Sequence, residues 1–113
     1  MKEGFALLLD SQPITWTSQE DRHLLWCRAL VQAGVQPVLI FSGPLKREFE
    51  EIFVANGAVV ASISYQSGLI RFYRTLKEIV NRYHITLVHI IFFDYFSAVA
   101  WIVRATGVKQ IVY

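Results

Sequence analysis

The chain has a single cysteine, Cys27, among its 113 residues. One thiol excludes an internal disulfide and any metal site built from cysteines alone. A reducing, cytosolic environment suits this composition better than an oxidising one. No secretory leader is visible, because the first apolar run, Phe5–Leu9, is short and Asp10 follows it directly.

An excess of charge of one sign is also missing. Eleven lysines and arginines face nine acidic residues, so the formal net charge is only +2. Domains dedicated to nucleic acid carry a far stronger basic surface. We therefore expect no nucleic acid among the partners of this protein.

The common phosphate-binding and metal-binding motifs are absent. The stretch from Asp10 to Thr17, where a G-x-G-x-x-G loop would stand in a dinucleotide-binding fold, contains no glycine, and the chain has no P-loop. His23, His84 and His89 fall on different predicted elements, and there is no H-E-x-x-H sequence. We expect no metal site and no cofactor bound by this chain.

What the sequence does contain is a repeat of apolar runs and amphipathic stretches. The runs are Phe5–Leu9, Val38–Phe41, Val59–Ile63, Leu87–Phe93 and Ile111–Tyr113. Continuous apolar runs are typical of parallel strands buried on both faces, and their alternation with helices is typical of βαβ units. The pattern predicts an α/β fold, with a parallel sheet of about five strands and helices on both faces. Because the last run reaches the end of the sequence, we expect the sheet to be incomplete and residues 1–113 to form one partial domain.

The first helix is predicted to begin near Thr17 or Ser18. Both Thr17-x-x-Glu20 and Ser18-x-x-Asp21 have the pattern of a capping box, in which a hydroxyl and a carboxylate satisfy free backbone N–H groups. Gly34 is expected to end this helix. The residues predicted for its inner face are Leu25, Trp26, Ala29, Leu30 and Ala33.

Three further helices are predicted from the same periodicity. The second has Pro44 in its first turn and ends at Gly57, the third runs over Leu69–Tyr83, and the fourth is closed by Gly107. Their predicted inner faces are Leu45, Phe49, Ile52 and Phe53 for the second, Leu69, Phe72, Tyr73, Leu76, Ile79, Val80 and Tyr83 for the third, and Ala98, Val99, Ile102 and Ala105 for the fourth.

The segment Leu87–Val103 permits a second interpretation. It is mostly apolar and just reaches the lower limit of about 17 residues for a membrane-spanning helix. Asp94 stands inside it, and an aspartate near the centre of a span costs roughly 2.5–3.5 kcal/mol on insertion scales. A buried strand followed by a buried helix explains the same residues and agrees with the repeat.

Three stretches stand out once the elements are in this order: Glu20–Ile40, Phe53–Val60 and Ile79–Tyr113. In these stretches the chain resembles the N-terminal half of a GT-B glycosyltransferase, most of all the family 4-like type. The first is similar to the family's acidic helix start and its L-x-x-x-G-h-x-V step into the second strand, the second repeats that step, and the third resembles the family's pD-h-V-H-h strand and r-x-x-G-h-P-h-V step. The sequence departs from the family where Thr17 and Ser18 stand in place of a glycine pair.

The resemblance implies a three-layer, Rossmann-like domain that binds the acceptor. A C-terminal domain, not contained in these residues, would bind a nucleotide-sugar, and the activity would be transfer of the sugar to a glycan, a lipid-linked acceptor or a small molecule. This chain would then be inactive alone. The alternative is a non-catalytic α/β binding module that pairs with a partner protein.

The resemblance and the strand ends together suggest five candidates for the acceptor cleft: Thr17, Ser18, Glu20, His89 and Asp94. Each has a structural alternative. Glu20 suits a capping-box carboxylate, His89 a buried histidine bonded to backbone, and Asp94 a helix cap. The aromatic residues around Asp94 form either an apolar acceptor pocket or core; they are Phe92, Phe93, Tyr95 and Phe96.

The third helix has a basic outer face. Arg71, Arg74, Lys77 and Arg82 are interrupted by a single acidic residue, Glu78. Such a face is either solvated or attracted to anionic lipid. We therefore expect a cytoplasmic protein, with peripheral attachment to the inner face of the membrane as the more specific hypothesis.

Overall fold

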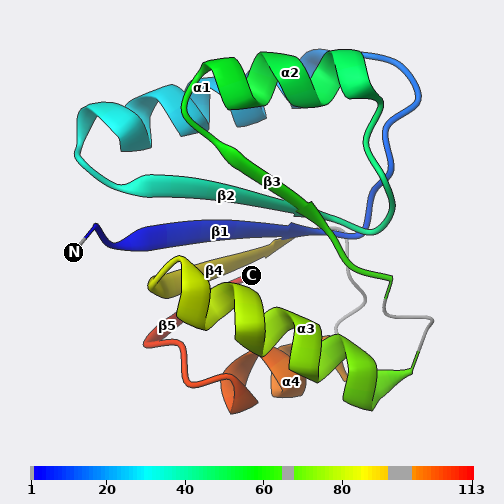
Figure 1. The fold of residues 1–113 in the computed structure, drawn as a ribbon, viewed down its shortest axis with the longest axis vertical. Coiled ribbons are helices and arrows are strands. Elements are labelled where there is room, and N and C mark those ends of the chain that lie inside the picture. Colours follow the sequence, from blue (N-terminus) through cyan, green and yellow to red (C-terminus); the bar gives the residue numbers. More distant parts are fainter. Residues whose placement is uncertain (1, 65–67, 92–97) are drawn as a thin grey trace.

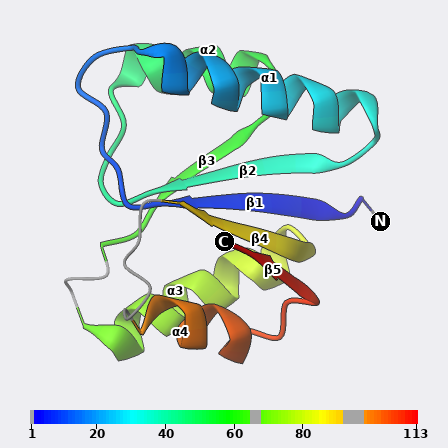
Figure 2. The same ribbon diagram turned by 180° about the vertical axis from the view of Figure 1, so that it is seen from behind.

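The computed structural model describes residues 2–64, 68–91 and 98–113, and it confirms the α/β prediction. A central sheet lies between one layer of α1 and α2 and a second layer of α3 and α4 (Figures 1 and 2). In chain order the elements are β1 (Gly4–Leu9), α1 (Ser18–Gln32), β2 (Gln36–Phe41), α2 (Arg47–Ala55), β3 (Val59–Ser62), α3 (Leu69–Arg82), β4 (Ile85–Ile91), α4 (Val99–Ala105) and β5 (Gln110–Val112).

The sheet that the described residues form has five strands in the order β3-β2-β1-β4-β5, and every neighbouring pair is parallel. The first and fourth apolar runs lie side by side, with Phe5 opposite Leu87 and Leu9 opposite Ile91. The chain moves from β1 outward to β3, then crosses back to β4 on the other side of β1. The order therefore reverses between β1 and β4, which is where ligands bind in open α/β sheets.

The sheet buries side chains on both faces, which explains why its strands lack alternation. Ala6 and Leu8 of β1 belong to the core under α3 and α4, whereas Leu7 and Leu9 belong to the core under α1 and α2. All four side chains are at most 2% exposed. An apolar residue is consequently needed at each of these positions.

The predicted inner face of α1 is wrong in part: Trp26 packs against the core, but three of the predicted residues are exposed. Leu25 is 62% exposed, and Ala29 and Ala33 are exposed as well. The buried residues are Glu20, His23 and Cys27, whose spacing places them on one side of the helix. The capping box holds Glu20 on the side of the helix that faces the sheet, and His23 and Cys27 lie on the same side. Two polar residues, Glu20 and His23, are therefore buried where apolar residues were predicted.

The second helix begins later than predicted. Its first residue is Arg47, so Pro44 and Leu45 precede the helix and do not form its first turn. Phe49 and Phe53 are buried as predicted, but Ile52 is 40% exposed. The inner face is narrower than predicted because this short helix touches the sheet along one stripe only.

The remaining predictions hold with smaller corrections. In α3 the buried residues Phe72, Leu76 and Val80 were predicted, but Leu69, in the first turn, is half exposed. In α4 the buried residues are Val99 and Val103, whereas the predicted Ala98 and Ala105 are exposed.

The segment Leu87–Val103 holds the end of β4 and most of α4, with residues 92–97 outside the described ranges. Within those ranges, no helix combines the length and the apolar character needed to span a bilayer. The strand-and-helix interpretation of the segment is the one that the described parts support.

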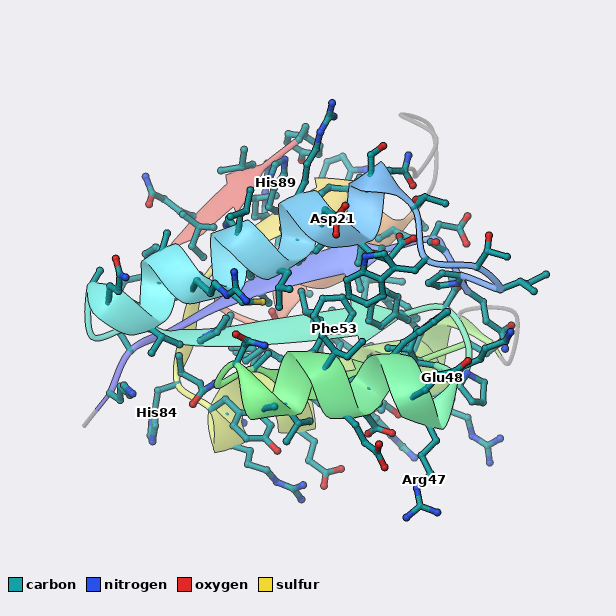
Figure 3. All side chains as sticks on the ribbon, turned by 90° about the horizontal axis from the view of Figure 1, so that it is seen from above. Asp21, Arg47, Glu48, Phe53, His84 and His89 are labelled. Carbon is teal, nitrogen blue, oxygen red and sulfur yellow. The ribbon has the colours of Figure 1, made fainter. Side chains whose placement is uncertain are left out.

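Helices cover the two faces of the sheet unequally. Figure 3, viewed onto α1 and α2, shows β5 extending beyond the area that these helices cover, with His89 of β4 beside it. The β4–β5 register places His89 opposite Val112, which is 40% exposed, and Tyr113 is 66% exposed. We call this part of the sheet, the α1 side of β4 and β5, the uncovered face.

Candidate functional site

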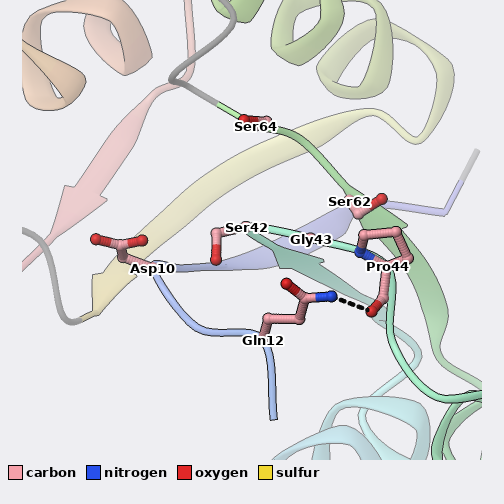
Figure 4. Close-up of a pocket in the computed structure, with 7 residues that line it drawn as sticks. All are labelled: Asp10, Gln12, Ser42, Gly43, Pro44, Ser62 and Ser64. Atoms are coloured by element: carbon pink, nitrogen blue, oxygen red, sulfur yellow. Dashed lines mark hydrogen bonds between the residues drawn. The ribbon is translucent and has the colours of Figure 1, made fainter. Parts of the chain in front are cut away.

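A pocket lies at the carboxyl ends of β1, β2 and β3 (Figure 4). Its volume is about 430 Å³. Its lining comes from the last residue of β3 and from residues that follow the three strands: Asp10, Gln12, Ser42, Gly43, Pro44, Ser62 and Ser64. The pocket adjoins the point where the strand order reverses, so its place is the one expected for a ligand site in this class of sheet.

Backbone hydrogen bonds hold the three loops in register. The Asp10 N–H donates to the carbonyl oxygen of Ile91 at 3.2 Å, and the Ser42 N–H donates to that of Ser11 at 3.0 Å. The Ile63 N–H donates to the Phe41 carbonyl at 2.8 Å. The rim of the pocket thus continues the sheet, and these hydrogen bonds fix the backbone positions of the residues that line it.

Gln12 and Gly43 fit closely together. The Gln12 side-chain Nε2 donates to the Pro44 carbonyl oxygen at 3.0 Å, so the amide lies across the second loop (Figure 4). A Cβ atom on Gly43 would clash with Oε1 of Gln12. With glycine at this position the glutamine amide can lie flat against the backbone, and a larger residue would require the flexible end of Gln12 to shift.

The chemistry of the lining is polar with a single charge. Among the seven lining residues, Asp10 is the one charged side chain, and the others that can form hydrogen bonds are serines and Gln12. A serine hydroxyl both donates and accepts, whereas a carboxylate only accepts. Across the described parts of the chain, no three His, Cys, Asp or Glu side chains are placed to hold a metal ion.

Thr17, Ser18 and Glu20, three of the predicted site residues, lie at the start of α1 and do not line the pocket. The Thr17 N–H and hydroxyl both donate to Oε1 of Glu20 at 2.8 Å, and Thr17 Oγ1 accepts from the Gln19 N–H at 3.2 Å. These contacts form the first of the two predicted capping boxes. The second does not form: Ser18 is already the first residue of the helix, and the Asp21 carboxylate accepts from the Trp16 indole at 2.7 Å.

Below the capping box lies a buried histidine. His23 is 9% exposed, and no hydrogen-bond partner of its Nδ1 exists among the described residues. Burial lowers the pKa of His23, and the nearby Glu20 carboxylate raises it to a smaller degree. One turn further, burial raises the pKa of the Cys27 thiol to about 12, so this cysteine is neutral and inert at physiological pH.

The predicted candidates on β4 are separate from the pocket. His89 is partly buried on the uncovered face, in register with Leu7 and Val112, and does not line the pocket. Asp94 lies outside the described residues. The same holds for Phe92, Phe93, Tyr95 and Phe96.

The predicted basic face of α3 is exposed. Arg71 and Arg74 line a second, shallower hollow of about 540 Å³ with Ile70. Arg82 pairs with Glu78 at 3.0 Å, an exposed contact that contributes little stability. Lys77 lies with its Nζ 5.6 Å from the centre of the Tyr73 ring.

The pocket residues were missed at the level of sequence, although a signal was present. Asp10, Ser42 and Ser64 each come directly after an apolar run. The carboxyl-end rule alone would have selected them. Gln12 and Gly43 offered no such signal, because their contact joins two loops far apart in the chain.

Comparison with known proteins adds no relative: no family model, curated protein or solved structure matches this chain. The function has to be argued from the fold and from the pocket.

Proposed function

We propose that this chain is the acceptor-binding N-terminal domain of a glycosyltransferase of the GT-B, family 4-like type. The full enzyme transfers a sugar from a nucleotide-sugar to a glycan, a lipid-linked acceptor or a small molecule. The observation that carries the proposal is the pocket at the carboxyl ends of β1–β3, beside the reversal of strand order, with its lining of hydroxyls, one amide and one carboxylate. The order of the sequence motifs supports it.

The chemistry of the pocket favours the acceptor over the donor. A nucleotide-sugar brings a pyrophosphate, which is bound by glycine-rich loops, helix N-termini or basic side chains. The loop after β1 has no glycine, and the Thr17 hydroxyl is engaged in the capping box of α1. The donor therefore belongs to a separate C-terminal domain, and this chain contributes the positioning of an acceptor hydroxyl across the cleft between domains.

The test uses the native protein, purified from its source cells with an antibody against this chain. The expected result is transfer from a radiolabelled nucleotide-sugar to an endogenous acceptor, while the isolated 113-residue chain shows neither transfer nor nucleotide-sugar binding. Native protein that binds no nucleotide-sugar and transfers no label would refute the proposal. Strong nucleotide-sugar binding by the isolated chain would contradict its acceptor role.

A second candidate function is a non-catalytic module that pairs with a partner protein. The uncovered face favours it, because Val112 is 40% exposed there and, among the described residues, no helix covers β5 on that side. Exposed apolar surface of this kind marks interaction sites. The same purification separates the two candidates: a stoichiometric partner subunit without sugar transfer supports the module.

The layer formed by α3 and α4 supports attachment to a membrane surface, which we include in the proposal for a cytoplasmic enzyme. Ile70 is 72% exposed and Trp101 is 73% exposed, although both are large and apolar. Arg71 and Arg74 stand beside Ile70, and the Arg104 guanidinium lies 5.7 Å from the Trp101 ring centre. Exposed apolar side chains among cations are typical of proteins that lie on anionic lipid.

Vesicle sedimentation tests this attachment. We expect the chain to bind vesicles rich in phosphatidylglycerol more tightly than vesicles of phosphatidylcholine, and the double variant R71Q/R74Q to lose roughly 10- to 30-fold in affinity, since each cation near the surface contributes about 1 kcal/mol. R22Q, on α1 in the opposite layer, is the control and should bind normally. Equal binding to both vesicle types would contradict the attachment.

A further inference from the structure

We infer that the pocket at the ends of β1–β3 selects a neutral, polyhydroxylated ligand and rejects the phosphate esters of the same compound. The inference rests on the proposed function, since it specifies the chemical class of the acceptor. It follows from three features of the pocket: the state of Asp10, the packing of Gln12 on Gly43, and the charge of the lining.

Asp10 is available to a ligand. Its backbone N–H is tied to Ile91 at 3.2 Å, which fixes the place of the residue at the reversal of strand order. Its side chain is exposed, and the described part of the chain offers it no hydrogen bond or ion pair. A carboxylate accepts hydrogen bonds only, so its natural partner is a donor, and two adjacent hydroxyls of a sugar can donate to its two oxygens.

Gln12 supplies an acceptor at the other side of the pocket. Its Nε2 is committed to the Pro44 carbonyl, so the orientation of the amide is set and Oε1 lies against Gly43. Serine hydroxyls from β2 and β3 complete the lining. The pocket thus offers mainly hydrogen-bond acceptors, together with hydroxyls that both donate and accept, and this set matches a ligand rich in O–H groups.

The lining carries no cation that could pair with a phosphate. Its seven residues include Asp10 and no lysine, arginine or histidine. A phosphate monoester entering the pocket would exchange its hydration for a like-charged carboxylate. Neutral sugars meet no such repulsion, so selectivity against phosphate is built into the residues present.

The test is amide NMR of the isolated chain with two matched sets of probes: neutral mono- and disaccharides, and their phosphate monoesters. Neutral probes should shift the signals of Ser42, Gly43 and Ser62, and phosphate esters should bind at least tenfold more weakly. D10N should lower the affinity for neutral sugars about tenfold and reduce the difference in affinity between neutral sugars and phosphate esters. E3Q, an exposed carboxylate before β1, should change neither value.

G43A provides a second variant that leaves Asp10 in place. Its Cβ should displace the Gln12 amide from the loop and weaken the binding of neutral sugars, while the preference for neutral sugars over phosphate esters is preserved.

Three results would overturn the inference. They are phosphate esters that bind the pocket as tightly as the neutral sugars, pocket signals that no neutral sugar shifts, and a ratio of the two affinities that D10N leaves unchanged. Sugar transfer by the native protein is a separate measurement. If the pocket binds phosphate esters but the native protein transfers sugar, the inference alone is wrong. If the pocket rejects phosphate esters but the native protein transfers no sugar, the proposed function alone is wrong.

Discussion

Replacing Phe53 by alanine should lower the free energy of unfolding by about 3–5 kcal/mol, the range measured for large aromatic truncations in protein cores. Phe53 is fully buried in α2. Its ring centre lies 5.2 Å from that of Trp16 and 6.3 Å from that of Phe41. The ring therefore joins three elements, and the cavity left by alanine is bordered by side chains that cannot all move inward.

Urea unfolding followed by circular dichroism measures this loss. Its control is I52A, the neighbouring residue on α2, which is 40% exposed and should cost far less. The effect should extend to the pocket, because Trp16 belongs to the loop that carries Asp10 and Gln12. An F53A protein as stable as I52A would show that the aromatic cluster does not hold α2 to the sheet.

Replacing His23 by leucine should stabilise the protein, by about 1–3 kcal/mol at neutral pH. The histidine buries an Nδ1 atom that has no partner among the described residues, and an unsatisfied buried polar group costs about this much. Leucine has a similar volume and brings no polar atom into this buried position. A loss of stability on H23L would indicate that the ring makes a polar contact essential to the helix.

The same histidine predicts how stability depends on pH. Because burial lowers the pKa of His23 below its usual 6.5, the unfolded chain binds a proton more readily than the folded one. Stability is therefore complete above pH 6.5 and falls as the pH decreases below it, by up to about 1.4 kcal/mol per pH unit, until the folded pKa is reached.

Unfolding titrations between pH 7.5 and pH 5 (about the range in which histidine titrates) should show this slope in the wild type and not in H23L. H84N is the control: His84 is exposed with a positive φ of 53°, a conformation that asparagine tolerates. A slope that persists in H23L would assign the pH dependence to another group.

The strands were predictable because their signals are local. Uninterrupted apolar runs identified the parallel strands, and glycines such as Gly34 and Gly57, both with positive φ, identified ends of helices. The rotation of α1 was not predictable in this way. It depends on the capping box and on the indole of Trp16 bonding to Asp21, so Leu25 faces solvent and His23 faces the core.

The candidate site was less accessible to prediction than the fold. The resemblance pointed to Thr17 and Glu20, and not to the residues after each strand. The hydrogen bonds of Thr17 and Glu20 cap the N-terminus of α1. The contact between Gln12 and Pro44 spans 32 positions of the chain. Such a contact exists only after β1 and β2 have paired, which explains why no short motif announces it.

The two backbone tethers at the pocket rim have a mechanical consequence. Asp10 is tied through its N–H to β4, whereas Ser42 is tied to the loop after β1 and continues β2. A ligand held by Asp10 at one end and by Ser62 at the other would link β1 and β4 to β3 and so restrict their relative motion. Occupancy would then register as slower amide exchange along β1, a strand that touches no ligand itself.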